Sequence, residues 1–199
     1  MSRNVKFRLV ALGIAMLGLA AATRAQEAPV FVISQEDSSI KFSVKASVAL
    51  EGDFDKWDAT LKFGSPELST GVLDVEIQAA SVNTGSGMKD GKLKSKDFFD
   101  VQHDPVIKFV STKITQTGPE TFAVAGTFTI RGVSKPETLT LTLHRDAAAE
   151  GEIKGTMAFD RKDYGMNSGI PFIKIADRVE VTVDLKVKRV SGPPVKLSQ

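Results

Sequence analysis

Side chains suited to acid–base chemistry or metal binding are sparse and scattered in this sequence. Its two histidines, His103 and His144, fall in unrelated segments without the His, Asp or Glu spacing of a metal site. Asp53, Asp55 and Asp58 lack the glycine and the distal glutamate of a calcium loop. Without cysteine there is no thiol nucleophile, and no serine lies in Gly-x-Ser-x-Gly. We therefore predict no catalytic residue, no metal and no cofactor, and interpret the protein as non-enzymatic.

One polar segment, residues 160–164, is a candidate for contacting a ligand head group. Its candidate residues are Arg161, Asp163 and Tyr164. A guanidinium suits a phosphate or a carbonyl because it presents several N–H donors in one plane. The alternative is an Asp–Arg pair that only shapes a turn. Both interpretations stay open from the sequence.

The elements that would position these residues are β-strands. Residues 38–46 place Ile40, Phe42 and Val44 on one face, and residues 138–144 alternate leucine with threonine. Such period-two patterns recur about eight times and predict antiparallel, mostly hairpin-linked strands. Eight strands pack as a sandwich or close as a barrel, and a closed barrel has room for one small ligand. We predict an all-β, single-domain fold with a short helical insertion near residues 88–101.

Large apolar side chains fall on the strand faces that must be buried, and the chain has 12 Phe against one Tyr. A dry tunnel for an apolar ligand is one interpretation, and an ordinary filled core is the other. Phe98 and Phe99 either cap the tunnel or fasten the helix to the barrel, and we favour the fastening role. The predicted tunnel residues are Phe42, Phe54, Trp57, Phe63, Val75, Ile77, Phe98, Phe99, Phe109, Phe128, Ile130, Leu141, Met157 and Phe159.

The first 25 residues are typical of a cleaved secretory signal peptide. Arg3, Lys6 and Arg8 precede an apolar run at 9–22, and small residues follow. We predict cleavage after Ala25, with Ala22 as the alternative. The apolar run is shorter than the ~20 residues of a membrane-spanning helix, which argues against an uncleaved anchor. The barrel domain is predicted at 26–190, followed by a flexible tail at 191–199.

The charge balance argues against a nucleic-acid partner. The chain has 26 basic and 24 acidic residues, and the leader contains four of the basic ones and no acid. The mature chain therefore has 22 basic and 24 acidic residues, without the excess of positive charge that phosphate binding favours. Its 174 residues (199 less 25) suit one domain.

Five segments occur in order across the mature chain: SVNTG (81–85), LKSKDFFDV (93–101), PVIKF (105–109), GTFTIRGVSKP (126–136) and DRKDYGM (160–166). Together they resemble the YceI family of periplasmic polyisoprenoid-binding proteins. The resemblance implies a lipocalin-like antiparallel β-barrel whose elongated apolar tunnel holds an isoprenoid or similar lipid. It implies carriage or storage rather than catalysis.

We therefore predict a periplasmic carrier that sequesters a polyisoprenoid-type chain. Burying about twenty carbons yields on the order of 15 kcal/mol, against ~4–15 kcal/mol for association, so a long chain is favoured. Three alternatives remain. The barrel carries fatty acids, fatty amides or amphiphilic drugs; it is a lipid-modifying enzyme using Asp160, Asp163 or His103; or it is an interaction module filled by its own side chains. The expected partner is a hydrophobic small molecule, with no nucleic acid and no stable membrane insertion. We also expect transient contact with a membrane or a membrane protein.

Overall fold

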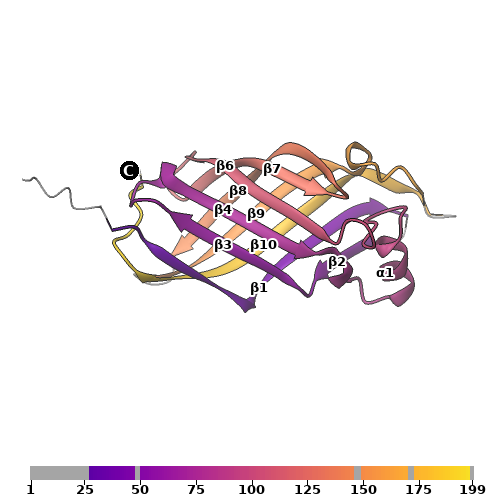
Figure 1. The fold of residues 1–199 in the computed structure, drawn as a ribbon, viewed down its shortest axis with the longest axis horizontal. Coiled ribbons are helices and arrows are strands. Elements are labelled where there is room, and N and C mark those ends of the chain that lie inside the picture. The colour runs from indigo at the N-terminus through magenta and orange to yellow at the C-terminus, as the bar shows by residue number, and fades with distance from the viewer. Residues whose placement is uncertain (1–26, 48–49, 146–148, 170–172, 198–199) are drawn as a thin grey trace, which may run out of the picture.

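The computed structural model describes residues 27–47, 50–145, 149–169 and 173–197. These residues form ten strands, one α-helix and three short 3-10 turns (Figure 1). The strands are β1 Val30–Ala46, β2 Leu50–Phe54, β3 Trp57–Phe63, β4 Gly71–Gln78, β5 Val82–Asn83, β6 Val106–Gln116, β7 Thr121–Ile130, β8 Val133–Arg145, β9 Glu150–Asp160 and β10 Ile175–Ser191. The helix α1 is Gly87–Lys94, and the 3-10 turns are η1 Leu68–Thr70, η2 Ala79–Ser81 and η3 Arg161–Tyr164.

The strands close into an antiparallel barrel. The sheet order is β10-β9-β8-β7-β6-β4-β3-β1-β2-β5, and β1 also pairs with β10 along most of its length. β2 pairs with the second half of β1, whereas β3 meets β1 only at Val30 and pairs fully with β4. β2 and β3 thus behave as one broken strand, and β5 extends β4 alongside β2. The predicted eight-stranded barrel is confirmed, and the sandwich is excluded.

The strand interiors follow the predicted alternation. On β7, Phe122, Val124, Phe128 and Ile130 are buried, while threonines and alanines alternate with them. β7 and β8 are joined by Arg131 and Gly132, both at positive φ (56° and 70°), as in the two-residue hairpin turns that match strand twist. The turn is confined to these two residues, because residues from Val133 onward already pair with β7.

The insertion between β5 and β6 contains the predicted short helix, in its first half. α1 ends at Lys94, and residues 95–104 continue as turns rather than helix. The backbone of Asp100 has φ 51°, in the left-handed region, which a continuing α-helix does not allow. The amide of Phe99 donates to the carbonyl of Leu93 (2.9 Å), so the chain folds back on the end of the helix.

The two ends of the barrel are closed by different segments. Figure 1 places α1 at one end and the C-terminus at the other. There the Lys196 amide donates to the Pro66 carbonyl (2.8 Å), and Leu197 packs against the core. The structure thus gives residues 191–197 a definite position, and their flexibility stays a prediction.

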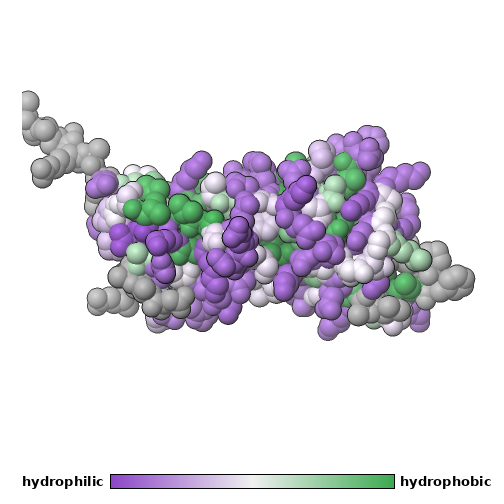
Figure 2. Space-filling view, turned by 90° about the horizontal axis from the view of Figure 1, so that it is seen from below, coloured by the Kyte–Doolittle hydropathy of each residue, from purple (hydrophilic) through white to green (hydrophobic). Residues whose placement is uncertain are grey.

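The face of the molecule shown in Figure 2 is mainly hydrophilic, with an apolar group towards the end opposite α1. Val30, Val32 and Val190 are exposed on the strands that reach this end. In the described part of the chain, no helix is both long and apolar enough to cross a membrane.

Candidate functional site

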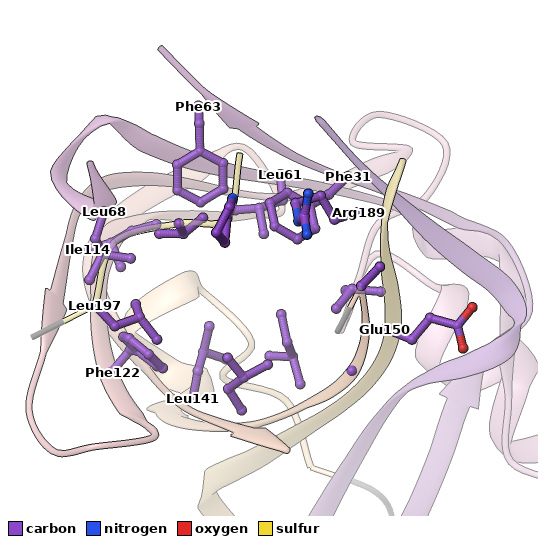
Figure 3. Close-up of a pocket in the computed structure, with 17 residues that line it drawn as sticks. Phe31, Leu61, Phe63, Leu68, Ile114, Phe122, Leu141, Glu150, Arg189 and Leu197 are labelled. Atoms are coloured by element: carbon purple, nitrogen blue, oxygen red, sulfur yellow. The ribbon is translucent and has the colours of Figure 1, made fainter. Parts of the chain in front are cut away.

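The larger cavity of the barrel, about 200 Å³, lies at the end that the C-terminal segment closes. We call it the tail-end chamber. Figure 3 shows side chains from β1, β3, β6, β7 and β8 converging on it, with Leu68 and Leu197 completing the wall. Its apolar lining is Phe31, Leu61, Phe63, Leu68, Ile114, Phe122, Leu141, Leu143, Ile153, Val187, Pro194, Val195 and Leu197, with Ala149 and Gly151.

Charged groups are confined to the rim of this chamber. Glu150 turns its carboxylate away from the cavity (Figure 3) and pairs with Lys188 at 2.7 Å. Arg189 donates from Nη1 to the carbonyl of Gly192 (2.5 Å), at the start of the tail. The chamber therefore suits an apolar chain or ring and offers charge only at its mouth.

A second cavity of about 70 Å³ lies beneath α1, and we call it the helix-end chamber. Aromatic rings crowd it: the ring centroids of Phe42 and Phe54 are 5.6 Å apart, and those of Phe54 and Phe99 are 5.9 Å apart. Phe128 and Phe159 pack on the opposite side at 5.2 Å. Such ring spacings are typical of favourable aromatic pairs, so this chamber is largely filled by its own walls.

Between the chambers lies a layer of inward-facing residues that line neither cavity. This central belt consists of Leu73, Val75, Phe109, Val124, Leu139 and Met157, all buried. The two chambers share no lining residue. The elongated tunnel that the family resemblance implies is therefore interrupted in this structure.

The structure sorts the predicted tunnel residues into separate places. Phe63 and Leu141 line the tail-end chamber. Val75, Phe109 and Met157 belong to the central belt, and Trp57 is half-buried against the core without lining either chamber. The other predicted residues line the helix-end chamber: Phe42, Phe54, Ile77, Phe98, Phe99, Phe128, Ile130 and Phe159.

Most of the tail-end chamber was missed from the sequence. Phe31, Leu61 and Phe122 lie in runs with the same alternation as the predicted tunnel residues, so the sequence did contain a signal for them. Leu68 and Leu197 were not predictable, because a 3-10 turn and a tail segment place them. The turn and the tail meet through the Lys196–Glu67 ion pair (2.7 Å), which joins residues far apart in the chain.

Arg161 is buried and satisfied by the protein itself. Its Nε donates to the carbonyl of Ala176 (3.2 Å), and its Nη1 donates to the carbonyls of Met166 and Ser168. Its Nη2 donates to Asp177 Oδ1 at 3.0 Å, and the side chain is only 7% exposed. This geometry favours the turn-shaping interpretation, with Asp177 rather than Asp160 as the acidic partner.

The other two head-group candidates do not face a cavity. Tyr164 is fully buried between Phe128 and Phe159, and its hydroxyl donates to Glu137 Oε1 (3.0 Å). Burial, reinforced by that carboxylate, raises the pKa of the Tyr164 hydroxyl. Asp163 is exposed. Their head-group roles stay predictions without geometric support.

The acid–base candidates lie on the outside of the barrel. His103 is largely exposed and contacts Asp100 at 2.9 Å, which raises the pKa of the imidazole. Asp160 is exposed and accepts a hydrogen bond from the Lys162 amide (2.9 Å). Within the ranges that the structure describes, no group of three or more His, Cys, Asp or Glu is placed to hold a metal ion. The predicted signal peptide, residues 1–25, lies outside the described residues.

Comparison with known proteins adds three findings. The model of the YceI-like domain matches residues 31–187. A UPF0312 protein of Pseudomonas savastanoi pv. phaseolicola is 30% identical over 177 residues, covering 84% of this chain and 90% of that protein. The crystal structure of Burkholderia cenocepacia BcnA is similar with a TM-score of 0.71 and 26% identity, over 78% of this chain and 99% of BcnA.

A more distant structure shares the fold. A polyisoprenoid binding domain from Saccharophagus degradans aligns with a TM-score of 0.63 at 15% identity, over 81% of this chain and 99% of that domain. At this identity the likeness concerns the barrel itself.

Proposed function

The chain belongs to the YceI family, and we propose that it is a periplasmic binding protein that holds the chain of a polyisoprenoid-type lipid inside its barrel. The observation that carries the proposal is the tail-end chamber of about 200 Å³, lined almost wholly by aliphatic and aromatic side chains. A dry cavity of this kind recognises apolar carbon chains and offers nothing to a polar substrate.

The polar surroundings support binding rather than catalysis. Glu150, Arg189 and their partners lie at the mouth, where the head group of a lipid would remain in water. The candidate acids and bases His103, Asp160 and Asp163 face solvent instead of converging on the cavity. A reaction centre needs titratable groups aimed at one point. The periplasmic location rests on the leader-like segment 1–25.

We propose the polyisoprenoid class of lipid because of a similarity to another protein of known structure. The polyisoprenoid binding domain from Saccharophagus degradans has the same barrel. A fatty acid, a fatty amide or an amphiphilic drug has the same apolar body and is the second candidate, because nothing in the chamber lining distinguishes a branched from an unbranched chain.

The test is to recover the natural ligand. The protein is expressed with its leader, purified from the periplasmic fraction without detergent and extracted with organic solvent, and the extract is identified by mass spectrometry. We expect a prenyl-chain lipid in near-stoichiometric amount. Recovery of a fatty amide would replace the ligand class. A blank extract combined with no binding of added prenyl lipids would contradict the proposal.

A matched pair of variants locates the ligand. Leu61→Glu places a carboxylate in the tail-end chamber, and Val72→Glu places one on the exposed outer face of the neighbouring strand. Burying an unpaired carboxylate is costly, so the first variant should lose the lipid and the second should retain it. Equal retention by both variants would place the ligand elsewhere.

A further inference from the structure

The central belt separates two apolar chambers that would otherwise form one continuous tunnel. Along β6, β7 and β9 the inward-facing order runs from tail-end chamber residues through belt residues to helix-end chamber residues. On β7 this order is Phe122, Val124, Gly126 and Phe128. The division is therefore made by side chains in the middle of the barrel and not by a break in the sheet.

The tail-end chamber alone is too small for a long lipid chain. An apolar cavity of about 150 Å³ holds one benzene molecule. A cavity of 200 Å³ then holds on the order of eight to ten carbon atoms, or about two isoprene units. Any further carbons must either remain outside the barrel or cross the belt.

Two inward-facing glycines, Gly126 and Gly155, leave space in the belt that neighbouring side chains fill. A Cβ atom on Gly126 would lie 2.6 Å from the Phe109 ring, and one on Gly155 would lie 2.6 Å from Leu141 and 3.3 Å from Leu139. Glycine within a strand often marks the close approach of another group. The missing side chains leave space over Gly126 and over Gly155. Phe109, which lies over Gly126, is the largest side chain that fills such a space.

We propose that Phe109, packed over Gly126, determines the length of chain that the barrel accepts. In this arrangement the chain is buried for about two isoprene units and stops at the ring of Phe109. The inference rests on the proposed function and deepens it, because it assigns a length limit to the same site.

The test uses the mature protein and two series of alcohols, one prenyl and one unbranched, each with 10, 15 and 20 carbons. Each buried methylene tightens binding about fourfold, so five further buried carbons would lower Kd roughly a thousandfold. We expect less than a tenfold gain between 10 and 20 carbons for the native chain. Phe109→Ala should restore a gain of at least about a hundredfold, measured by fluorescence competition and native mass spectrometry.

Phe99→Ala is the matched control, because it removes an equally buried ring from the helix-end chamber and leaves the belt intact. It should keep the native length limit. Phe109→Leu and Met157→Ala remove less side-chain volume from the belt. They replace Phe109→Ala as the test variants if circular dichroism shows that Phe109→Ala does not fold. Both should move the limit towards longer chains.

The outcomes separate the two proposals. Binding that tightens steadily to 20 carbons in the native protein would overturn the length limit while supporting lipid binding. A limit seen only with unbranched alcohols would support the role of Phe109 and contradict the prenyl class. No binding in either series would overturn both proposals. A limit unchanged in every folded belt variant would overturn the role of Phe109.

Discussion

The two ends of the barrel are closed in contrasting ways. At the helix end, the closing segment is tied by contacts between near neighbours in the chain: the Thr84 hydroxyl donates to Asp90 (2.7 Å), and Lys92 pairs with Asp97 (2.5 Å). At the tail end, residues 193–197 are tied to β-barrel loops more than a hundred positions away. The helix end is filled with aromatic rings, whereas the tail end contains the larger cavity.

This difference indicates that the two ends of the barrel have different roles. The segment around α1 is stabilised by its own local hydrogen bonds and by buried rings, so we expect the helix end of the barrel to stay closed. A terminal segment with few contacts opens at low cost, because local opening is easiest where little apolar surface is buried. Ligand exchange is therefore expected at the tail end.

The firmness of the helix end depends on Phe98. This ring is buried and lies 5.8 Å from Lys92 Nζ. Phe98→Ala should destabilise the protein by about 3–5 kcal/mol, as for other buried aromatic side chains, in urea unfolding. Met88→Ala, on the exposed face of α1, should change it by less than ~0.5 kcal/mol. Equal losses of stability in the two variants would contradict the role of Phe98 in keeping the helix end closed.

Arg161 tests whether the helix end contains a head-group site. Arg161→Leu leaves the carbonyls of Met166, Ser168 and Ala176 without their donor, and should cost about 3 kcal/mol in urea unfolding. Lys162→Met removes the other cation that pairs with Asp177, at the surface, and should cost below ~1 kcal/mol. Lipid affinity of the folded Arg161→Leu protein should be native. A selective loss of affinity for lipids with anionic head groups would instead support the head-group role.

The tail end is tested by Leu197, which is partly buried against the core and lines the cavity. Leu197→Ala should cost only about 1 kcal/mol, because part of the side chain already contacts water. It should also raise the rate of ligand release in stopped-flow displacement. Lys196→Ala removes only the surface pair with Glu67 and should leave that rate near native. Native release from Leu197→Ala would argue against exchange at this end.

Acid should weaken the tail end through Glu152, which lies between two residues that line its cavity. Hydrogen bonds from Lys186 and Lys154 lower the pKa of Glu152 from 4.5 to about 2. Because the folded pKa is the lower one, this stabilisation is complete above pH 4.5 and is lost as the pH falls towards 2. Glu152→Gln should flatten the dependence of Tm on pH in that window.

Glu180→Gln is the matched control for this prediction, since Glu180 lies on β10 and forms an ion pair with the exposed Arg178. It should leave the acid dependence native. If Glu152→Gln also kept the native slope between pH 4.5 and 2, the pair of lysines around Glu152 would not support the tail end.

Much of the fold was predictable because the alternation of a strand is visible in residues that are neighbours in the sequence. Phe122, Val124 and Phe128 face inward because alternate residues of a strand point to the same side of the sheet. Less of the site was predictable. Phe42 and Phe63 have the same pattern, yet they line different chambers. Alternation tells which face a residue occupies but not its height along the barrel, which depends on pairing register and strand tilt.

The sequence by itself determined the antiparallel strands, their interior faces and the insertion between β5 and β6, and its resemblance to the YceI family implied the barrel. Only the tertiary structure decided that Phe109 covers Gly126, that Arg161 is satisfied by backbone carbonyls and that the tail closes the larger chamber. The physical reason is range. Period-two patterns and turn residues act over a few positions, whereas cavities arise where side chains from distant strands meet or fail to meet.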